Sequence, residues 1–316
     1  MADGDDARAS PEVETLAVHP VPIVAGALVA GGHTCVLDQG RRDVSVYRDG
    51  RVMRASSPAP VHALLSNPRQ RELFLLCPDG VRILDTDDGT LRHVDCEVGD
   101  TVHGCAINGN ASAVAFARPR GGETRSSVHL LLLHQQSCHD LAWGPLRWGR
   151  VQALAFSAGS RTLAVLFRHD RPTLADLATG KTRQISFDHL YGPVDLAEIP
   201  DGRWAVASKD HVILLRDPTR PTRIRGASYT GIEVGRPIEA FAVALDGSML
   251  AAGCAGLDGH GASGPSQAEV RIRGTGGGQP RFDVATHHGR AIHVVFDADG
   301  SVVSFGSDGS VLRIRT

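Results

Sequence analysis

Polar side chains that could ligate a metal or transfer protons recur at one place in a repeated segment of this chain. Each follows a β-branched residue that opens a short apolar run. The six are His62, His103, Gln152, Asp195, Glu239 and His293. Imidazole and carboxylate groups bind zinc and other divalent ions, and they also serve as general acids and bases. If the repeats are structurally equivalent, these six side chains form one ring around a common axis.

The repeat itself predicts the fold. The β-branched residues that open the runs are Val61, Val102, Val151, Val194, Ile238 and Ile292. They recur at intervals of about 40–50 residues, and each interval contains several short strand patterns, which is typical of a β-propeller blade. The unit that opens at Val151 is the clearest, because Gly180 provides the positive φ that its last hairpin turn needs. We therefore expect an all-β, seven-bladed propeller of four-stranded blades.

The two ends of the chain are expected to share the last blade. The final unit has only three strand patterns, which are Ile292–Phe296, Ser301–Phe305 and Ser310–Arg315. Val13–His19 precedes the first unit, at about Val21–Ser57, and has no partner within it. An N-terminal strand that completes the last blade leaves no open sheet edge between the ends of the array. We expect residues 1–12 to be a disordered acidic tail and residues 13–316 to form one propeller domain.

The expected ring of polar residues has three interpretations. It could bind a divalent ion, it could be polar because water fills the axis, or it could form part of a docking surface for a partner. Opposite members of so wide a ring are too far apart for metal–ligand bonds of about 2 Å. We therefore predict no metal and no cofactor, while neighbouring members remain close enough to interact electrostatically.

No sequence motif for covalent or phosphate chemistry is present. The chain has no GxSxG, no HExxH and no phosphate-binding loop. The glycine-rich segment Gly274–Gly278 leads to Pro280 instead of a helix, so it is interpreted as a hairpin turn. The segment His134–Asp140 holds metal-capable residues at a spacing that matches no common site. These patterns favour a protein that binds over one that catalyses.

Large and cationic side chains gather in the loops between neighbouring units. Trp, Tyr and Arg dominate the energetics of protein interfaces, and loops tend to carry function. The predicted partner-binding residues are Arg147, Trp148, His189, Tyr191, Tyr229 and His260. His260 lies in one of two long loops, Ala255–Gln267 and Arg118–Ser127, which are expected on the same face. The alternatives are that the aromatic rings pack on adjacent blades and that the long loops are tolerated insertions.

Composition narrows the classes of partner and compartment. The formal net charge is −2, which argues against a nucleic-acid or anionic-membrane surface. No segment approaches the length of a membrane-spanning helix, and no signal peptide precedes the first unit. Six scattered cysteines without a CxxC pair indicate a reducing compartment, so we expect a cytoplasmic protein. Arginine far outnumbers the two lysines, Lys181 and Lys209, a bias that suggests a GC-rich bacterial genome.

The last unit resembles a blade of the WD-repeat family. Its matching residues are His287, Asp299, Gly300, Ser307, Asp308 and Gly309. Asp201-Gly202 and Asp246-Gly247 resemble the family's first turn in earlier units. The Trp-Asp dipeptide of the family is absent, with Arg315 and Ala175 at the tryptophan position in two units. The resemblance implies a propeller that presents one rim to protein partners.

We therefore expect a non-catalytic interaction scaffold or adaptor that presents one face to a protein partner. The alternative function is a metal- or small-molecule-binding propeller, either an enzyme or a sensor, that uses the axial channel. A subunit of a larger bacterial assembly is a third interpretation.

Overall fold

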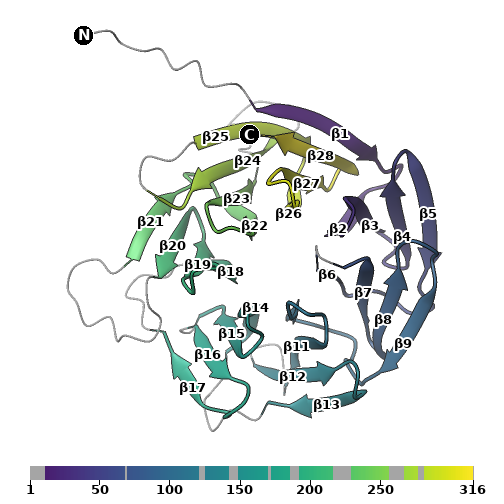
Figure 1. Ribbon diagram of the computed structural model, residues 1–316, viewed down its shortest axis with the longest axis vertical. Coiled ribbons are helices and arrows are strands. Elements are labelled where there is room, and N and C mark those ends of the chain that lie inside the picture. The colour runs from purple at the N-terminus through teal and green to yellow at the C-terminus, as the bar shows by residue number, and fades with distance from the viewer. Residues whose placement is uncertain are drawn as a thin grey trace.

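The computed structural model of this chain describes residues 11–67, 70–120, 125–141, 149–169, 172–185, 192–215, 229–255, 267–276 and 281–315. The regular secondary structure of these residues is entirely β, in seven four-stranded antiparallel sheets. Figure 1 shows the sheets arranged as a ring, with the chain passing from blade to blade in sequence order. This confirms the prediction of an all-β, seven-bladed propeller with four-stranded blades.

Each of the first six blades runs from its innermost to its outermost strand. Blade 1 consists of β2 (Ile23–Val29), β3 (His33–Asp38), β4 (Asp43–Arg48) and β5 (Arg51–Ser56). Blade 2 consists of β6 (Ala63–Ser66), β7 (Glu72–Cys77), β8 (Gly80–Asp85) and β9 (Leu91–Asp95). Blade 3 consists of β10 (Gly104–Ile107), β11 (Ala113–Pro119), β12 (Ser126–Leu132) and β13 (Ser137–Asp140).

The remaining blades continue the pattern. Blade 4 consists of β14 (Val151–Phe156), β15 (Thr162–Phe167), β16 (Thr173–Asp176) and β17 (Thr182–Gln184). Blade 5 consists of β18 (Pro193–Glu198), β19 (Trp204–Ser208), β20 (His211–Leu215) and β21 (Tyr229–Glu233). Blade 6 consists of β22 (Ile238–Val243), β23 (Met249–Cys254), β24 (Gln267–Gly274) and β25 (Arg281–His288). Blade 7 consists of β26 (Ala291–Phe296), β27 (Val302–Gly306), β28 (Ser310–Arg315) and β1 (Glu12–Val18).

Blade 7 contains strands from both ends of the chain. β1 pairs antiparallel with β28, from Glu12 opposite Arg315 to Val18 opposite Ser310, with an irregularity after Thr15. In Figure 1 the purple β1 lies along the outer side of the yellow β28. The strand begins at Glu12, within the segment expected to be a tail, and residues 1–10 lie outside the described part of the chain.

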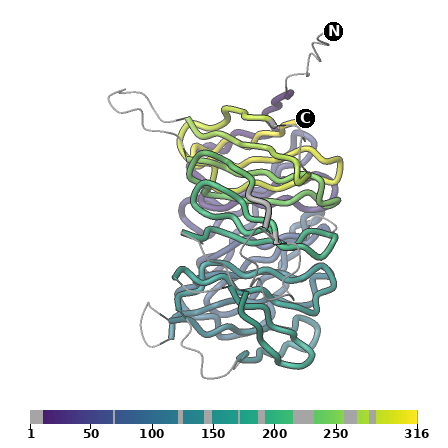
Figure 2. Tube along the Cα trace, turned by 90° about the vertical axis from the view of Figure 1, so that its left-hand side faces the viewer, coloured from purple at the N-terminus to yellow at the C-terminus, as the bar shows by residue number. Residues whose placement is uncertain are grey.

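The apolar core is divided into seven clusters, and each lies between two neighbouring blades. Between blades 7 and 1, for example, Phe305 packs with Leu28 and Val36. Gly26 faces the Phe305 ring so closely that a Cβ at that position would collide with it. Figure 2 shows the ring from the side, with the sheets standing next to one another. Neighbouring blades thus pack face to face, as the two sheets of a β-sandwich do.

The alternating strand direction sends the loops to two opposite faces. We call one the entry face. It carries the loops that lead into each innermost strand, such as residues 234–237, and the loops between second and third strands, such as residues 39–42. The other, the exit face, carries the turns between first and second strands and between third and fourth strands. The six polar residues lie at the entry-face end of the innermost strands.

Candidate functional site

The innermost strands have a β-bulge close to their entry-face end. In β14, Val151 is opposite Phe167. The next pairing joins Ala153 to Leu166, so Gln152 is an extra residue without a partner of its own. Such an insertion locally interrupts the ladder and redirects the side chains near it.

The same irregularity recurs in the other blades. Blades 1, 5, 6 and 7 show the same register shift. In blade 2, the N–H of His62 donates to the carbonyl of Leu76, which also faces Ala63, and His103 in blade 3 is arranged alike. In blade order, the bulge position holds Val24, His62, His103, Gln152, Val194, Glu239 and Ile292.

This register corrects the predicted ring. His62, His103, Gln152 and Glu239 occupy equivalent positions, as expected. Asp195 and His293 lie one residue further along, because Val194 and Ile292 take the bulge position themselves. In the other blades that next position holds small residues, namely Ala25, Ala63, Gly104, Ala153 and Ala240. The expectation that all six side chains share one ring is therefore wrong for Asp195 and His293.

The polar residues at the bulge position contact neighbouring loops of the entry face. His62 Nε2 lies 2.9 Å from the carbonyl oxygen of Gly99, in the loop that leads into blade 3. The guanidinium of Arg41, from a loop of blade 1, donates to the His62 carbonyl at 3.3 Å. His103 Nδ1 lies 2.8 Å from Ser126 Oγ. The contacts of His62 link successive blades, whereas Ser126 lies in β12 of the same blade as His103.

Glu239 joins blade 6 to blade 7 through an ion pair. Arg290 Nε donates to Glu239 Oε1 at 2.7 Å, and the Glu239 side chain is only 17% exposed. Its second oxygen, Oε2, is buried and accepts no hydrogen bond from the described residues. Leaving one oxygen of a buried carboxylate without a donor costs free energy.

Asp195 and His293 are ionisable residues at a strand position that holds alanine or glycine in the other five blades. Burial raises the pKa of Asp195 to about 7, although the Leu196 N–H donates to its Oδ1 at 2.8 Å and favours the charged form. Burial lowers the pKa of His293 to about 4, and its ring lies 5.7 Å from that of Phe305. Both side chains retain partial solvent exposure. At neutral pH the imidazole is thus uncharged and Asp195 is near its titration midpoint.

By residue type, the six polar residues near the axis are candidate ligands for a divalent ion. Within the described ranges, no three His, Cys, Asp or Glu side chains come together in a group that could hold a metal ion. A structural or catalytic zinc site needs at least three protein ligands. The polar residues near the axis do not form such a set.

The two faces differ in charge. Among the described loop residues, the cationic side chains of the entry face are Arg41, Arg42, Arg120, Arg125, Arg150, Arg168, Lys209, Arg236 and Arg290, and its acidic ones are Asp79, Glu97, Asp100, Asp210 and Asp308. The cationic residues of the exit face are Arg71, Arg161, Lys181 and Arg203, and its acidic ones are Asp49, Asp87, Asp88, Asp201, Asp246, Asp297 and Asp299. Among these described loop residues, cations thus outnumber acids on the entry face, and acids outnumber cations on the exit face.

The predicted partner-binding residues stay untested. Arg147, Trp148, His189, Tyr191 and His260 lie outside the described residues. Tyr229 is the first residue of β21, opposite Leu215 in β20. The middle portions of the two long loops also lie outside the described ranges.

A hydrogen-bond network anchors the last blade at the entry face. His287 is fully buried, its Nδ1 lies 2.6 Å from Ser310 Oγ, and its Nε2 lies 2.7 Å from Ser304 Oγ. Asp308 accepts from the His288 N–H at 2.8 Å and from the Ser310 hydroxyl at 2.6 Å. The resemblance identified His287 and Asp308, whereas it did not identify the two serines.

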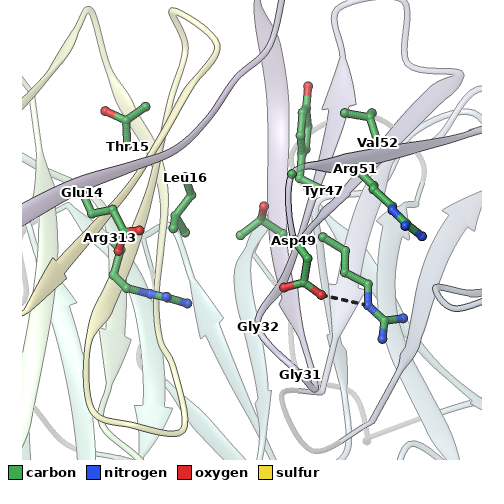
Figure 3. A pocket seen from close by; sticks show the side chains of 13 residues that line it. Glu14, Thr15, Leu16, Gly31, Gly32, Tyr47, Asp49, Arg51, Val52 and Arg313 are labelled. Atoms are coloured by element: carbon green, nitrogen blue, oxygen red, sulfur yellow. Dashed lines mark ion pairs between the residues drawn. The ribbon is translucent and has the colours of Figure 1, made fainter.

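A polar cleft of about 450 Å³ lies on the exit-face side between blades 7 and 1. In Figure 3, Arg313 points into it from β28, and Tyr47, Arg51 and Val52 line the opposite wall. Arg313 forms an ion pair with Asp297 at 2.9 Å, and Arg48 pairs with Asp49 at 3.5 Å. The cleft is separate from the bulge residues of the entry face.

Comparison with known proteins identifies no family. No protein-family model matches the chain, and no curated protein matches its sequence. The described residues contain no helix with the length and hydropathy needed to span a bilayer. A function for this propeller is therefore argued from its own geometry and charge.

Proposed function

We propose that this propeller is a non-catalytic protein-interaction module that binds an acidic partner on its entry face. The observation that supports this most directly is the opposite charge balance of the described loop residues on the two faces. Complementary charge speeds association and fixes the orientation of docking. The fold is consistent with such a role, since β-propellers commonly serve as interaction scaffolds.

The local chemistry of the entry face supports the same proposal. Arg41 and Arg42 donate to backbone carbonyls, and neither forms an ion pair with any described residue. Arg168 and Lys209 are exposed and likewise have no acidic partner in the described ranges. Their charges are free to pair with carboxylates of a partner. Trp148 and Tyr191, which lie outside the described residues, remain predicted apolar anchors.

We also propose that the chain is a degenerate WD-repeat-like propeller. The His287 network supports this, because it ties the end of β25 to β27 and β28, and the motif residue Asp308 accepts from the adjacent His288 N–H. Ser310 supplies a hydroxyl partner to His287 in a blade that lacks the Trp-Asp dipeptide.

Matched charge reversals on the two faces test the proposal. The variant Arg168→Glu/Lys209→Glu alters the entry face, and Arg161→Glu/Lys181→Glu alters the exit face with the same residue types in the same region of the ring. Tagged proteins are incubated with native lysate, and retained proteins are quantified by mass spectrometry. The entry-face variant should lose the specific partner about tenfold or more, and binding to the unaltered protein should weaken as salt rises.

The exit-face variant provides the control. It should retain the partner at the level of the unaltered protein. Equal loss from both variants, or loss only from the exit-face variant, would contradict the assignment of the docking face. Both variants should keep melting temperatures close to that of the unaltered protein, because the four substituted side chains are exposed and the Arg161–Asp176 ion pair, at 3.2 Å, is a surface pair of small energy.

A further inference from the structure

Two thiols meet at the outer part of the boundary between blades 2 and 3, away from the bulge positions. Cys138 lies in β13, the outermost strand of blade 3, and its side chain is exposed. Cys96 directly follows β9, the outermost strand of blade 2, and is partly buried. Although 41 residues separate them in sequence, the propeller brings these two segments together.

The strand register shows which way Cys138 faces. One row of directly paired residues crosses the whole of blade 3, in the order Ile107, Val114, Leu131 and Cys138. Directly paired residues in an antiparallel sheet share one face. Val114 and Leu131 belong to the core cluster between blades 2 and 3. Cys138 therefore lies on the face of blade 3 that packs against blade 2.

Cys96 reaches the same boundary from the opposite side. It packs against the same core cluster, to which its alternate neighbours Val94 and Val98 also belong. The backbone is fixed there, because the Cys96 N–H donates to the carbonyl of Asp79 at 3.2 Å. The next residue, Glu97, accepts from Arg118 of blade 3 through its backbone carbonyl at 3.2 Å. Both sides of the contact are thus held in place.

The two thiol groups are neighbours. Burial raises the pKa of the Cys96 thiol, and the adjacent Cys138 thiol raises this pKa further. Three of the other cysteines, Cys35, Cys77 and Cys254, are fully buried in the core. Cys138 is therefore an exposed thiol beside a second thiol, the arrangement in which a sulfenic acid on the exposed sulfur is resolved as a reversible disulfide.

We propose that Cys96 and Cys138 are a redox-active pair that hydroperoxides oxidise to an intramolecular disulfide joining blades 2 and 3. The peroxide first transfers an oxygen to the exposed Cys138 thiol, which becomes a sulfenic acid, and one water or alcohol leaves. The Cys96 sulfur then attacks the Cys138 sulfur and displaces the hydroxyl group, which leaves as water with the Cys96 proton. Two thiols lose two electrons and two protons, and the peroxide O–O bond is reduced.

The disulfide would add a second covalent link between two blades that are otherwise joined by the backbone of residues 96–103. It closes a long loop of the chain and so restricts the unfolded state. A thiol reductant reverses the reaction by exchange. Oxidation would therefore stabilise this sector of the ring and alter the outer rim near β13 without changing the fold.

Oxidation of the reduced full-length protein with hydrogen peroxide tests the proposal. The intact mass of the chain should fall by about 2 Da as two hydrogens are lost. Proteolysis under non-reducing conditions should release one peptide pair that links Cys96 to Cys138. The melting temperature should rise by roughly 5 °C and return to its starting value after dithiothreitol.

Cysteine variants separate this pair from the other thiols. Cys96→Ser and Cys138→Ser should each abolish the mass loss, while Cys105→Ser should retain it. The linked peptide is measured on the unaltered chain, so the test does not depend on the folding of any variant. Oxidation of Cys138 to a stable sulfinic acid while Cys96 stays alkylatable would overturn the proposal, as would a disulfide between two chains or with a different cysteine.

Discussion

His287 Nε2 lies 2.7 Å from Ser304 Oγ, and the histidine side chain is completely buried. This contact connects β25, the outermost strand of blade 6, with the second strand of blade 7. Gly306 leaves room for it, because a Cβ at that position would collide with the imidazole. Burial lowers the pKa of His287 to about 4, so the ring is neutral at pH 7. Each of its two nitrogens forms a hydrogen bond with one serine hydroxyl.

Replacement of His287 by alanine should lower the free energy of unfolding by about 2–4 kcal/mol. The change removes two buried hydrogen bonds and leaves a cavity beside the Ser304 hydroxyl. Urea denaturation followed by circular dichroism measures the effect. The neighbouring variant His288→Ala is the control, because the His288 side chain is exposed and only its backbone N–H binds Asp308. A loss of similar size in both variants would show that the buried network is not responsible.

Asp195 should make stability depend on pH. Its pKa is about 7 in the folded protein and about 4 in the unfolded chain. Between these values the folded state holds a proton that the unfolded state has released, so stability falls as pH rises from about 4 to 7. Asp195→Asn should therefore be more stable than the unaltered protein at pH 8 by about 1–2 kcal/mol. The gain is less than the full shift implies, since solvent reaches the side chain.

Thermal unfolding at a series of pH values between 4 and 8 measures this difference. Near pH 4 both proteins carry an uncharged side chain at position 195, so their stabilities should converge. His293 has the opposite sign, because burial lowers its pKa to about 4 and the unfolded chain takes up the proton first as pH falls. His293→Gln should thus reduce the loss of stability below pH 6. A stability difference for Asp195→Asn that stays constant with pH would contradict the assignment.

Val294→Asp should destabilise the last blade by about 3–5 kcal/mol. Val294 is 1% exposed within the cluster between blades 6 and 7, and a carboxylate there has no cationic partner among the described residues. Val18→Asp is the matched control in the same blade, since Val18 is 68% exposed. Chemical denaturation should show little change for the control. Comparable losses for the two variants would argue against a tightly packed boundary between these blades.

The fold could be predicted because the same residue types recur at the same places in each repeat. β-branched residues such as Val151 and Ile238 open each inner strand, and turn residues such as Gly180, with φ of 66°, close the hairpins. Both depend on local conformation and on which residues are apolar. The blade count followed from the recurrence of these signals.

The register of the inner strands could not be predicted in the same way. A β-bulge adds one residue to one strand, and nothing in the alternation of apolar residues shows which residue is extra. Val194 and Ile292 occupy the bulge, whereas in blades 4 and 6 the corresponding residues are the polar Gln152 and Glu239. The sequence pattern aligned the β-branched residues, and this moved Asp195 and His293 by one position.

Contacts between side chains that are far apart in the sequence could not be predicted either. Ser304 and Ser310 resemble many other strand serines, and only the pairing of β27 with β28 brings both hydroxyls to His287. The proximity of Cys96 to Cys138 likewise depends on two adjacent blades. The unequal charge of the described loops on the two faces could not be foreseen from the net charge of −2, because a total does not show on which face each residue lies.

The division of the core between blades has a consequence for damaged chains. No blade encloses its own apolar side chains, so each sheet relies on two neighbours for cover. Deletion or proteolytic loss of any single blade would leave a bare hydrophobic wall on each side of the gap. Such a fragment could bury this exposed apolar surface only against a second molecule, so we expect it to aggregate.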